Sequence, residues 1–172
     1  NSFMLFYNTF LPEKQQSMMA RLTFTNTINS VSNTVTYDEE TGARITQPKN
    51  INGNWSASGG FVFNTPLKNK KFTVSTFSDG SYNNMVGFTS LSGQTDSQKN
   101  TTRSLNLSER LNGTFRNDWF EFGLNGGIRY NVSKSTLQPQ SDKETFDYSF
   151  GASSNVTLPW DVTVSTDASY SM

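Results

Sequence analysis

The sequence predicts an all-β protein of about eight long antiparallel strands, arranged as an up-and-down transmembrane β-barrel. Three observations predict this class. Apolar and polar residues alternate along most of the chain, the alternating segments are long, and the connections between them are alternately tight and wide. Soluble strands average about 5–6 residues, whereas a tilted strand needs about 9–11 residues to cross a bilayer. The long segments are therefore typical of membrane-crossing strands.

The clearest alternation lies in segment 145–158. Phe146 and Phe150 fall on one parity, and Asp147 and Ser149 fall on the other. Successive side chains of a strand point to opposite faces, so a period of two predicts one apolar face and one polar face. The same pattern predicts strands in segments 17–37, 51–64, 71–82, 103–117, 119–132, 145–158 and 161–172. Segment 1–10 is apolar on both parities and is expected to be another strand.

We expect the apolar parities of these strands to form one lipid-facing surface. That parity includes Phe61, Phe72, Phe122, Phe150 and Val164. The opposite parity carries small polar residues such as Asn125, Ser149 and Ser165, with scattered charges at Asp79, Arg110, Glu121, Arg129 and Asp167. Small polar groups leave space for water, so the pattern favours a wide lumen over a small barrel filled by its own side chains.

The connections predict which strand ends lie together. The tight ones are 11–16, 65–70, 117–118 and 159–161, and the wide ones are 38–50, 89–102 and 133–144. Pro, Asn and Asp in the tight connections are turn formers. Bacterial barrels have short periplasmic turns and long loops at the other end, and this sequence has the same arrangement.

Aromatic residues gather near the predicted strand ends. Phe63, Phe72, Phe115, Phe120 and Trp160 lie beside the tight turns, and Tyr82, Phe88, Tyr130, Phe146, Tyr148 and Tyr170 lie toward the wide loops. The apolar positions between these groups are smaller, as at Ala57 and Ala152. Two aromatic belts around an aliphatic band are typical of membrane barrels.

Three positions depart from this pattern. Glu109 and Asn26 share the apolar parity of their strands, and the alternation of 17–37 is lost near Ser30 and Val31. If the lipid band starts at the tight turns, Glu109 is expected near its outer edge, where a carboxylate costs little. The lost alternation is explained either by a position above the bilayer or by a β-bulge.

Composition excludes several classes of function. The chain contains 14 Lys+Arg and 14 Asp+Glu, with no His and no Cys. It therefore lacks the basic excess of nucleic-acid-binding proteins and the commonest general base and metal ligands. We expect no enzyme, no cofactor and no nucleic-acid partner. The sequence identifies no catalytic, cofactor-binding or metal-binding residue.

A soluble antiparallel sandwich is the main alternative fold, because its sheets also alternate. Charged residues make up 16% of the chain, below the about 25–35% of a soluble surface. Gly59–Gly60 and Gly126–Gly127 fall inside strands and mark close approach or curvature rather than phosphate loops. The acidic run 38–40 could suggest Ca²⁺, but no EF-hand spacing follows, so a solvated loop tip is favoured.

Several strand-and-turn motifs resemble a known family. They are Asn52-Gly53-Asn54-Trp55, the stretch 61–72 containing Asn64-Thr65-Pro66-Leu67, Arg116-Asn117-Asp118-Trp119-Phe120-Glu121-Phe122-Gly123, and Thr145-Phe146-Asp147-Tyr148-Ser149-Phe150-Gly151. They are similar to Bacteroidetes-type outer-membrane barrel proteins related to TonB-dependent receptors. The resemblance implies a large barrel with an N-terminal plug domain in the Gram-negative outer membrane, energised through a TonB-type periplasmic partner.

On this basis we expect residues 1–172 to be a wall segment of one outer-membrane β-barrel domain, without its plug domain or signal peptide. Its partners would be outer-membrane lipid and the remaining strands of the parent barrel. Transport of a solute across the outer membrane is the expected function. The alternative is a structural or adhesive outer-membrane protein that displays the loops 38–50, 89–102 and 133–144. We expect an open, curved sheet whose first and last strands are not paired with one another.

Overall fold

The computed structural model describes residues 1–38, 40–67, 70–90, 96–160 and 162–172. An eight-stranded antiparallel sheet, in the order β1-β2-β5-β6-β7-β8-β9-β10, makes up most of them. Its strands are β1 (Ser2–Leu11), β2 (Gln16–Thr27), β5 (Asn54–Pro66), β6 (Phe72–Thr89), β7 (Gln98–Arg116), β8 (Phe120–Ser135), β9 (Lys143–Leu158) and β10 (Val162–Ser171). The all-β prediction and the antiparallel, chain-ordered main sheet are confirmed.

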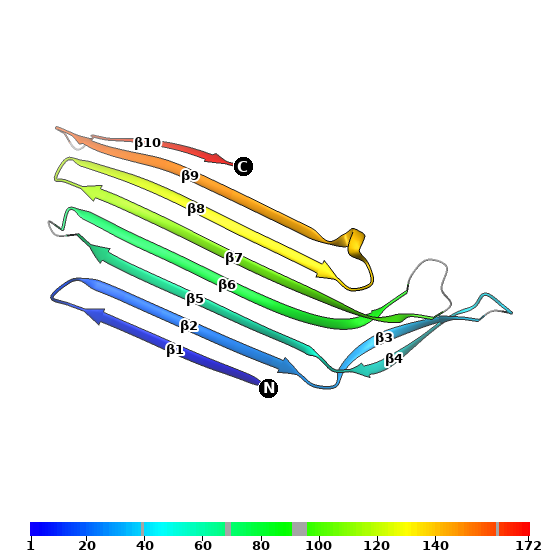
Figure 1. Ribbon diagram of the computed structural model, residues 1–172. Coiled ribbons are helices and arrows are strands. Elements are labelled where there is room, and N and C mark those ends of the chain that lie inside the picture. Colours follow the sequence, from blue (N-terminus) through cyan, green and yellow to red (C-terminus); the bar gives the residue numbers. More distant parts are fainter. Residues whose placement is uncertain (39, 68–69, 91–95, 161) are drawn as a thin grey trace.

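The sheet is one open layer, with β1 and β10 at its two edges (Figure 1). The edge strands are not hydrogen-bonded to one another, as expected for this chain. The tight turns lie at one end of the layer and the wide connections at the other (Figure 1). Parts of the predicted connections 38–50, 65–70, 89–102 and 159–161 lie outside the described residues.

The tight turns use left-handed backbone at residues other than glycine. Gln15 has φ 52°, Lys70 has φ 56° and Trp160 has φ 80°. The first turn is closed by the Gln15 N–H, which donates to the Pro12 carbonyl over 3.2 Å. Left-handed backbone costs an ordinary residue about 1–2 kcal/mol, so strand pairing on both sides must hold these turns.

The segment 17–37 is not one strand as predicted. Pairing of β2 with β5 is continuous down to Thr27, and the chain then turns at Asn29, where φ is 55°. It enters a separate two-stranded sheet of β3 (Ser30–Tyr37) and β4 (Arg44–Ile51). The lost alternation therefore marks the end of a strand and not a bulge. The predicted loop 38–50 is largely the second strand of this hairpin.

The strand register places all the apolar parities on one side of the sheet. Phe61 pairs with Ser78, whose parity on β6 includes Phe72, and the Phe72–Phe115–Phe122 pairing carries that side across to β8. The pairings of β8 with β9 and β9 with β10 extend it to Phe150 and Val164. We call this side the apolar face, and the opposite side, with Asn125, Ser149 and Ser165, the polar face. The predicted parity is confirmed as one continuous surface.

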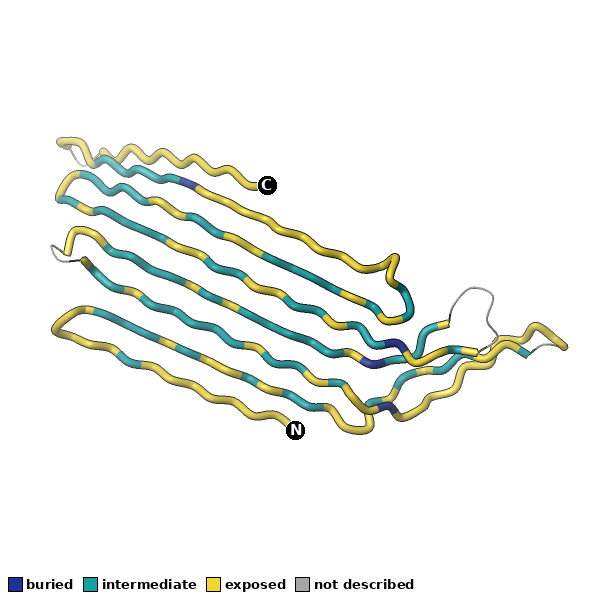
Figure 2. Tube along the Cα trace, viewed as in Figure 1, coloured by how far each residue is buried: buried dark blue, intermediate teal, exposed yellow. Residues whose placement is uncertain are grey.

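Neither face is covered by a second layer. Among the described residues, Ile51 and Val86 are the buried apolar side chains, while Phe150 is 58% exposed and Leu124 is 54% exposed. Figure 2 shows intermediate burial through the middle strands and exposure along β1 and β10. Helical structure in the described segments is one 3₁₀ turn, η1 (Pro139–Ser141). No helix there has the length and apolar character needed to cross a membrane.

Gly53, between β4 and β5, gives the first testable prediction. Its φ is +112°, and an added Cβ would lie 3.0 Å from Val86 Cγ2. Gly53→Ala should therefore lower the free energy of unfolding by about 1–3 kcal/mol, measured by denaturant titration in detergent micelles. Gly113→Ala is the control, because an added Cβ there has no neighbour within 4 Å. Equal effects of the two substitutions would contradict this account.

Candidate functional site

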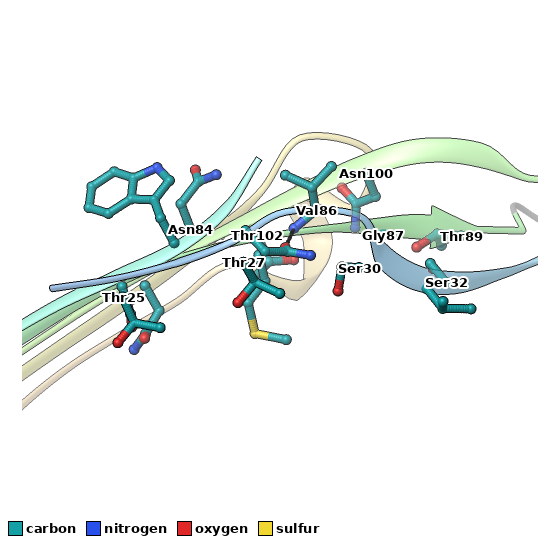
Figure 3. Close-up of a pocket in the computed structure, with 16 residues that line it drawn as sticks. Thr25, Thr27, Ser30, Ser32, Asn84, Val86, Gly87, Thr89, Asn100 and Thr102 are labelled. Atoms are coloured by element: carbon teal, nitrogen blue, oxygen red, sulfur yellow. Dashed lines mark hydrogen bonds between the residues drawn. The ribbon is translucent and has the colours of Figure 1, made fainter. Parts of the chain in front are cut away.

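A group of uncharged polar side chains lies where the β3–β4 hairpin departs from the main sheet. We call it the loop-end hollow, a cavity of about 510 Å³. It is lined by Thr25, Thr27, Ser30, Val31, Ser32, Asn54, Trp55, Ser56, Asn83, Asn84, Met85, Val86, Gly87, Thr89, Asn100 and Thr102. Figure 3 shows side chains from β2, β3, β6 and β7 gathered at this point.

At the loop-end hollow, hydrogen bonds to side chains take the place of backbone pairing along the end of β6. Pairing of β5 with β6 stops at Trp55 and Asn84, which leaves the last part of β6 without a backbone partner on that side. The Val86 N–H donates to Asn54 Oδ1 over 2.6 Å, and the Phe88 N–H donates to Ser32 Oγ over 3.3 Å. Backbone donors need such partners when they are shielded from water. Asn54 therefore holds the start of β5 against the end of β6, and Ser32 holds β3 against it.

Two further bonds fix the β3–β4 hairpin to the sheet. The Asn29 N–H donates to Asn52 Oδ1 over 2.6 Å, which joins the start and the end of the hairpin. The Val35 N–H donates to Ser97 Oγ over 2.8 Å, just before β7 begins. The hairpin is thus bonded both at its base and part-way along its length.

Asn100 is the buried polar side chain of the described residues, with 8% exposure. Its Oδ1 accepts hydrogen bonds from the Ser135 hydroxyl at 3.0 Å, the Thr136 hydroxyl at 3.0 Å and the Leu137 N–H at 3.1 Å. Asn100 lines the hollow on β7 and also holds the start of the connection from β8 to β9. The connection from β8 to β9 is therefore joined to the hollow through one amide.

The lining of the loop-end hollow contains no Asp, Glu, Lys or Arg. Hydroxyl and amide groups both donate and accept hydrogen bonds, so the hollow suits water and uncharged polar groups. It provides no general base, no nucleophile–base pair and no metal ligand set. Within the described part of the chain, no group of three or more acidic, His or Cys side chains could hold a metal ion.

A second cavity, the mid-sheet hollow, lies on the polar face over β7, β8 and β9 and also measures about 510 Å³. Unlike the loop-end hollow it is charged, because Arg110, Arg129, Asp147 and Glu109 are among its lining residues. The predicted polar-face positions of Asp79, Arg110, Glu121, Arg129 and Asp167 all agree with the register. Glu121 forms an ion pair with its cross-strand partner Arg116, whose Nε donates to Glu121 Oε2 over 2.6 Å.

Glu109 lies on the apolar face, as its parity predicted. Its partner Ser78 is six residues from Phe72 and four residues from Tyr82. The Thr76 hydroxyl donates a hydrogen bond to Glu109 Oε1. Glu109 and Glu121 are on opposite faces and cannot form a carboxylate pair.

Two apolar hollows flank Glu109 on the apolar face. One, of about 620 Å³, includes Leu111, Gly113, Leu124 and Phe150, and the other, of about 440 Å³, includes Leu22, Phe24, Gly59 and Leu107. The second explains Gly59, because an added Cβ there would lie 3.0 Å from Leu22 Cδ2. The glycine pairs inside the strands thus make room for neighbouring side chains.

The acidic run at the hairpin tip forms a turn. Asp38 Oδ1 accepts hydrogen bonds from the Thr41 N–H at 2.8 Å, the Thr41 hydroxyl at 2.8 Å and the Glu40 N–H at 3.1 Å. These bonds, led by that of the Thr41 N–H, lower the pKa of the Asp38 carboxyl below its ordinary value. Glu39 lies outside the described residues. The bonds of Asp38 are those of a turn cap, which agrees with the favoured reading of a loop tip.

Comparisons with protein-family models, with curated proteins and with solved structures found no match to this chain. The two hollows were not foreseen from the sequence. The loop-end hollow is lined partly by residues of the β3–β4 hairpin, and the second strand of that hairpin lies in a segment that the sequence predicted to be a long loop. Part of the mid-sheet hollow could have been predicted from the sequence, because the tight turn 117–118 fixes which residues of β7 and β8 lie opposite each other.

Asn100 gives the prediction for this site. Asn100→Ala should lower the free energy of unfolding by about 1–3 kcal/mol, because it leaves three donors without an acceptor. Asn106→Ala is the matched control on the same strand, since Asn106 is exposed and its Nδ2 donates one bond, to Ser81 Oγ over 3.2 Å. Denaturant titration of both variants in detergent micelles measures the difference. A loss at Asn106 as large as that at Asn100 would contradict the role given to Asn100.

Proposed function

We propose that the chain is a wall segment of an outer-membrane β-barrel of the TonB-dependent-receptor-like type, which contributes to transport of a solute across the Gram-negative outer membrane. The observation that carries the proposal is the continuous apolar face of the eight-stranded sheet. Large side chains such as Leu124 and Phe150 are exposed there over several strands. Exposed apolar surfaces that extend over several strands mark contact with a membrane or another protein.

The spacing of the aromatic side chains supports lipid as that contact. Phe72 and Phe115 have ring centroids 4.6 Å apart near the tight turns, and Trp55 and Tyr82 stack at 5.0 Å nearer the wide loops. The ten residue-to-residue steps from Phe72 to Tyr82 rise about 33 Å along the strand, or about 25 Å at a tilt of about 40°. The apolar band of an outer-membrane barrel is about 25 Å tall.

Glu109 lies within this band, and the Thr76 hydroxyl bonds to it. Glu144 lies on the same face at the level of Tyr82, where it accepts a hydrogen bond from the Tyr130 hydroxyl. Acidic residues on a lipid-facing surface cost less than basic ones, and a neighbouring hydroxyl reduces the cost of desolvation. The polar face accords with a water-filled lumen, because small uncharged side chains predominate on it.

The edges of the sheet support a larger barrel. Backbone groups inside a bilayer need internal partners, so spanning sheets close on themselves. β1 and β10 are not paired with one another. We propose that further strands of a larger barrel pair with both. A plug domain and a TonB-type periplasmic partner belong to the proposal through the family resemblance, not through residues described here.

The β3–β4 hairpin favours a second candidate, a structural or adhesive outer-membrane protein. The hairpin projects beyond the wide-loop end of the main sheet (Figure 1). Its side-chain bonds to Ser97 and Asn52 hold it in place without a ligand. A rigid projecting hairpin suits binding to an external surface. A hydrolytic function has no support, because the sequence contains no His to act as a base.

Adjacent labels on β8 test the membrane placement. Leu124 lies on the apolar face and Asn125 on the polar face, and the chain has no Cys, so Leu124→Cys and Asn125→Cys each carry a single spin label. In lipid vesicles, relaxation of the Leu124 label should respond more to oxygen, and that of the Asn125 label more to a water-soluble nickel chelate. Equal responses of both labels to the chelate would contradict a lipid-facing surface.

Solute uptake by the full-length protein separates the two candidates. Import of the TonB-dependent type should fall to background when the inner-membrane gradient is dissipated with a protonophore. Uptake that is unchanged by the protonophore counts against the importer. Loss of cell adhesion on deletion of 30–51, with uptake unchanged, would favour the adhesive candidate.

A further inference from the structure

We propose that the mid-sheet hollow binds an oxyanion group, a carboxylate or a phosphate, between Arg110 and Arg129. The register makes the two arginines neighbours across β7 and β8. Arg110 pairs with Gly127 and Arg129 pairs with Ser108, so the two arginines are diagonal neighbours on β7 and β8. Diagonal neighbours in an antiparallel pair are about 7–8 Å apart at Cα, within reach of two long side chains converging on one small group.

Both arginines are available to a ligand. In the described part of the chain neither has a hydrogen-bond or ion-pair partner, and the salt bridge found there joins Arg116 to Glu121 instead. A guanidinium presents a planar fork of donors that matches a carboxylate or phosphate. Two guanidinium groups without partners thus line one cavity of about 510 Å³, and a carboxylate or a phosphate is the group that they would bind.

The floor of the hollow is shaped to admit a ligand. Gly127, opposite Arg110, has no side chain, and an added Cβ would lie 3.2 Å from Ser149 Oγ. The lining also includes Ser108, Ser149 and Ser171, which lie on the polar face. Their hydroxyls can donate to the oxygens that the two guanidinium groups leave free.

Two carboxylates face this region and set its charge. Asp147 lies opposite Arg129 and lines the hollow, but it forms no ion pair with that arginine. Asp79, on β6, has its Oδ1 3.1 Å from where a Cβ on Gly60 would be, so it leans toward β5 and away from β7. On the polar face the lining therefore has two guanidinium groups and the carboxylate of Asp147. Glu109 is also a lining residue, but it lies on the apolar face, where its Oε1 accepts a hydrogen bond from the Thr76 hydroxyl.

The mid-sheet hollow differs in this from the loop-end hollow, which has no charged lining residue. In a transport protein, an oxyanion site half-way down the polar face would favour acidic solutes over neutral ones of the same size. This preference for acidic solutes rests on the proposed function. Binding of an oxyanion in the mid-sheet hollow does not, because binding requires no membrane.

Calorimetric titration of the full chain in detergent micelles tests the site, with inorganic phosphate in one series and succinate in another. Arg110→Gln and Arg129→Gln should each weaken binding about threefold to tenfold, since each removes one charge-assisted contact in a solvent-exposed site. Asp147→Asn should strengthen it, because the competing carboxylate is gone. Arg110→Lys should bind less tightly than the unaltered chain, because a point charge replaces the fork.

Arg21→Gln is the matched control. Arg21 lies on the polar face at the level of Arg129, through the pairing Arg21–Gly60–Asp79–Ser108–Arg129, but it does not line the hollow. Its affinity for phosphate and succinate should be unchanged. Equal weakening by Arg21→Gln, or weaker binding after Asp147→Asn, would overturn the site. Phosphate binding without succinate binding, or the reverse, would identify which oxyanion the site takes. Absence of binding to both would reject the site and leave the membrane placement, tested by the β8 labels, unaffected.

Discussion

The arrangement of this protein depends on the uninterrupted register of its main sheet. Side chains of a strand alternate between faces, so a slip of one residue at any pair would move that strand's apolar residues to the polar face. Each adjacent pair keeps a single register along its whole paired length, including the long pairing of β6 with β7. The tight turns set these registers, and left-handed residues such as Gln15 and Lys70 are held in them by the strands on both sides.

A face built in this way has no core to stabilise it. The buried apolar side chains of the described residues, Ile51 and Val86, lie at the base of the hairpin and not in the middle of the sheet. The ladder hydrogen bonds and the contacts along the apolar face must therefore stabilise the strands. Such contacts gain most when the face is removed from water, which is why lipid on this face agrees with the proposed function. The same argument explains why polar side chains occur at the hairpin, where Asn54 and Ser32 supply bonds that no strand provides.

The polar face carries the chemical differences along the sheet. Small residues predominate, so the few large polar side chains determine what each level of the face can bind. At the wide-loop end the lining is uncharged and Asn100 connects it to the loop after β8. Half-way along the sheet, Arg110 lies opposite Gly127 and Arg129 lies opposite Ser108, and both arginines line the mid-sheet hollow. A solute moving along this face would meet neutral groups first and guanidinium groups second.

The sequence by itself determined the strands and their faces. Alternation has a period of two whatever the neighbours are, so the parity of Phe122, Phe150 and Val164 could be predicted without knowing any partner. The end of β2 at Thr27 could not, because Ser30–Tyr37 is as polar as a loop and becomes a strand only by pairing with β4. The position of Glu109 opposite Ser78 and the diagonal placement of Arg110 and Arg129 were likewise decided by the tertiary structure. Both depend on which residue of one strand lies opposite which residue of the next, and pairing across a sheet is a long-range property that local patterns do not contain.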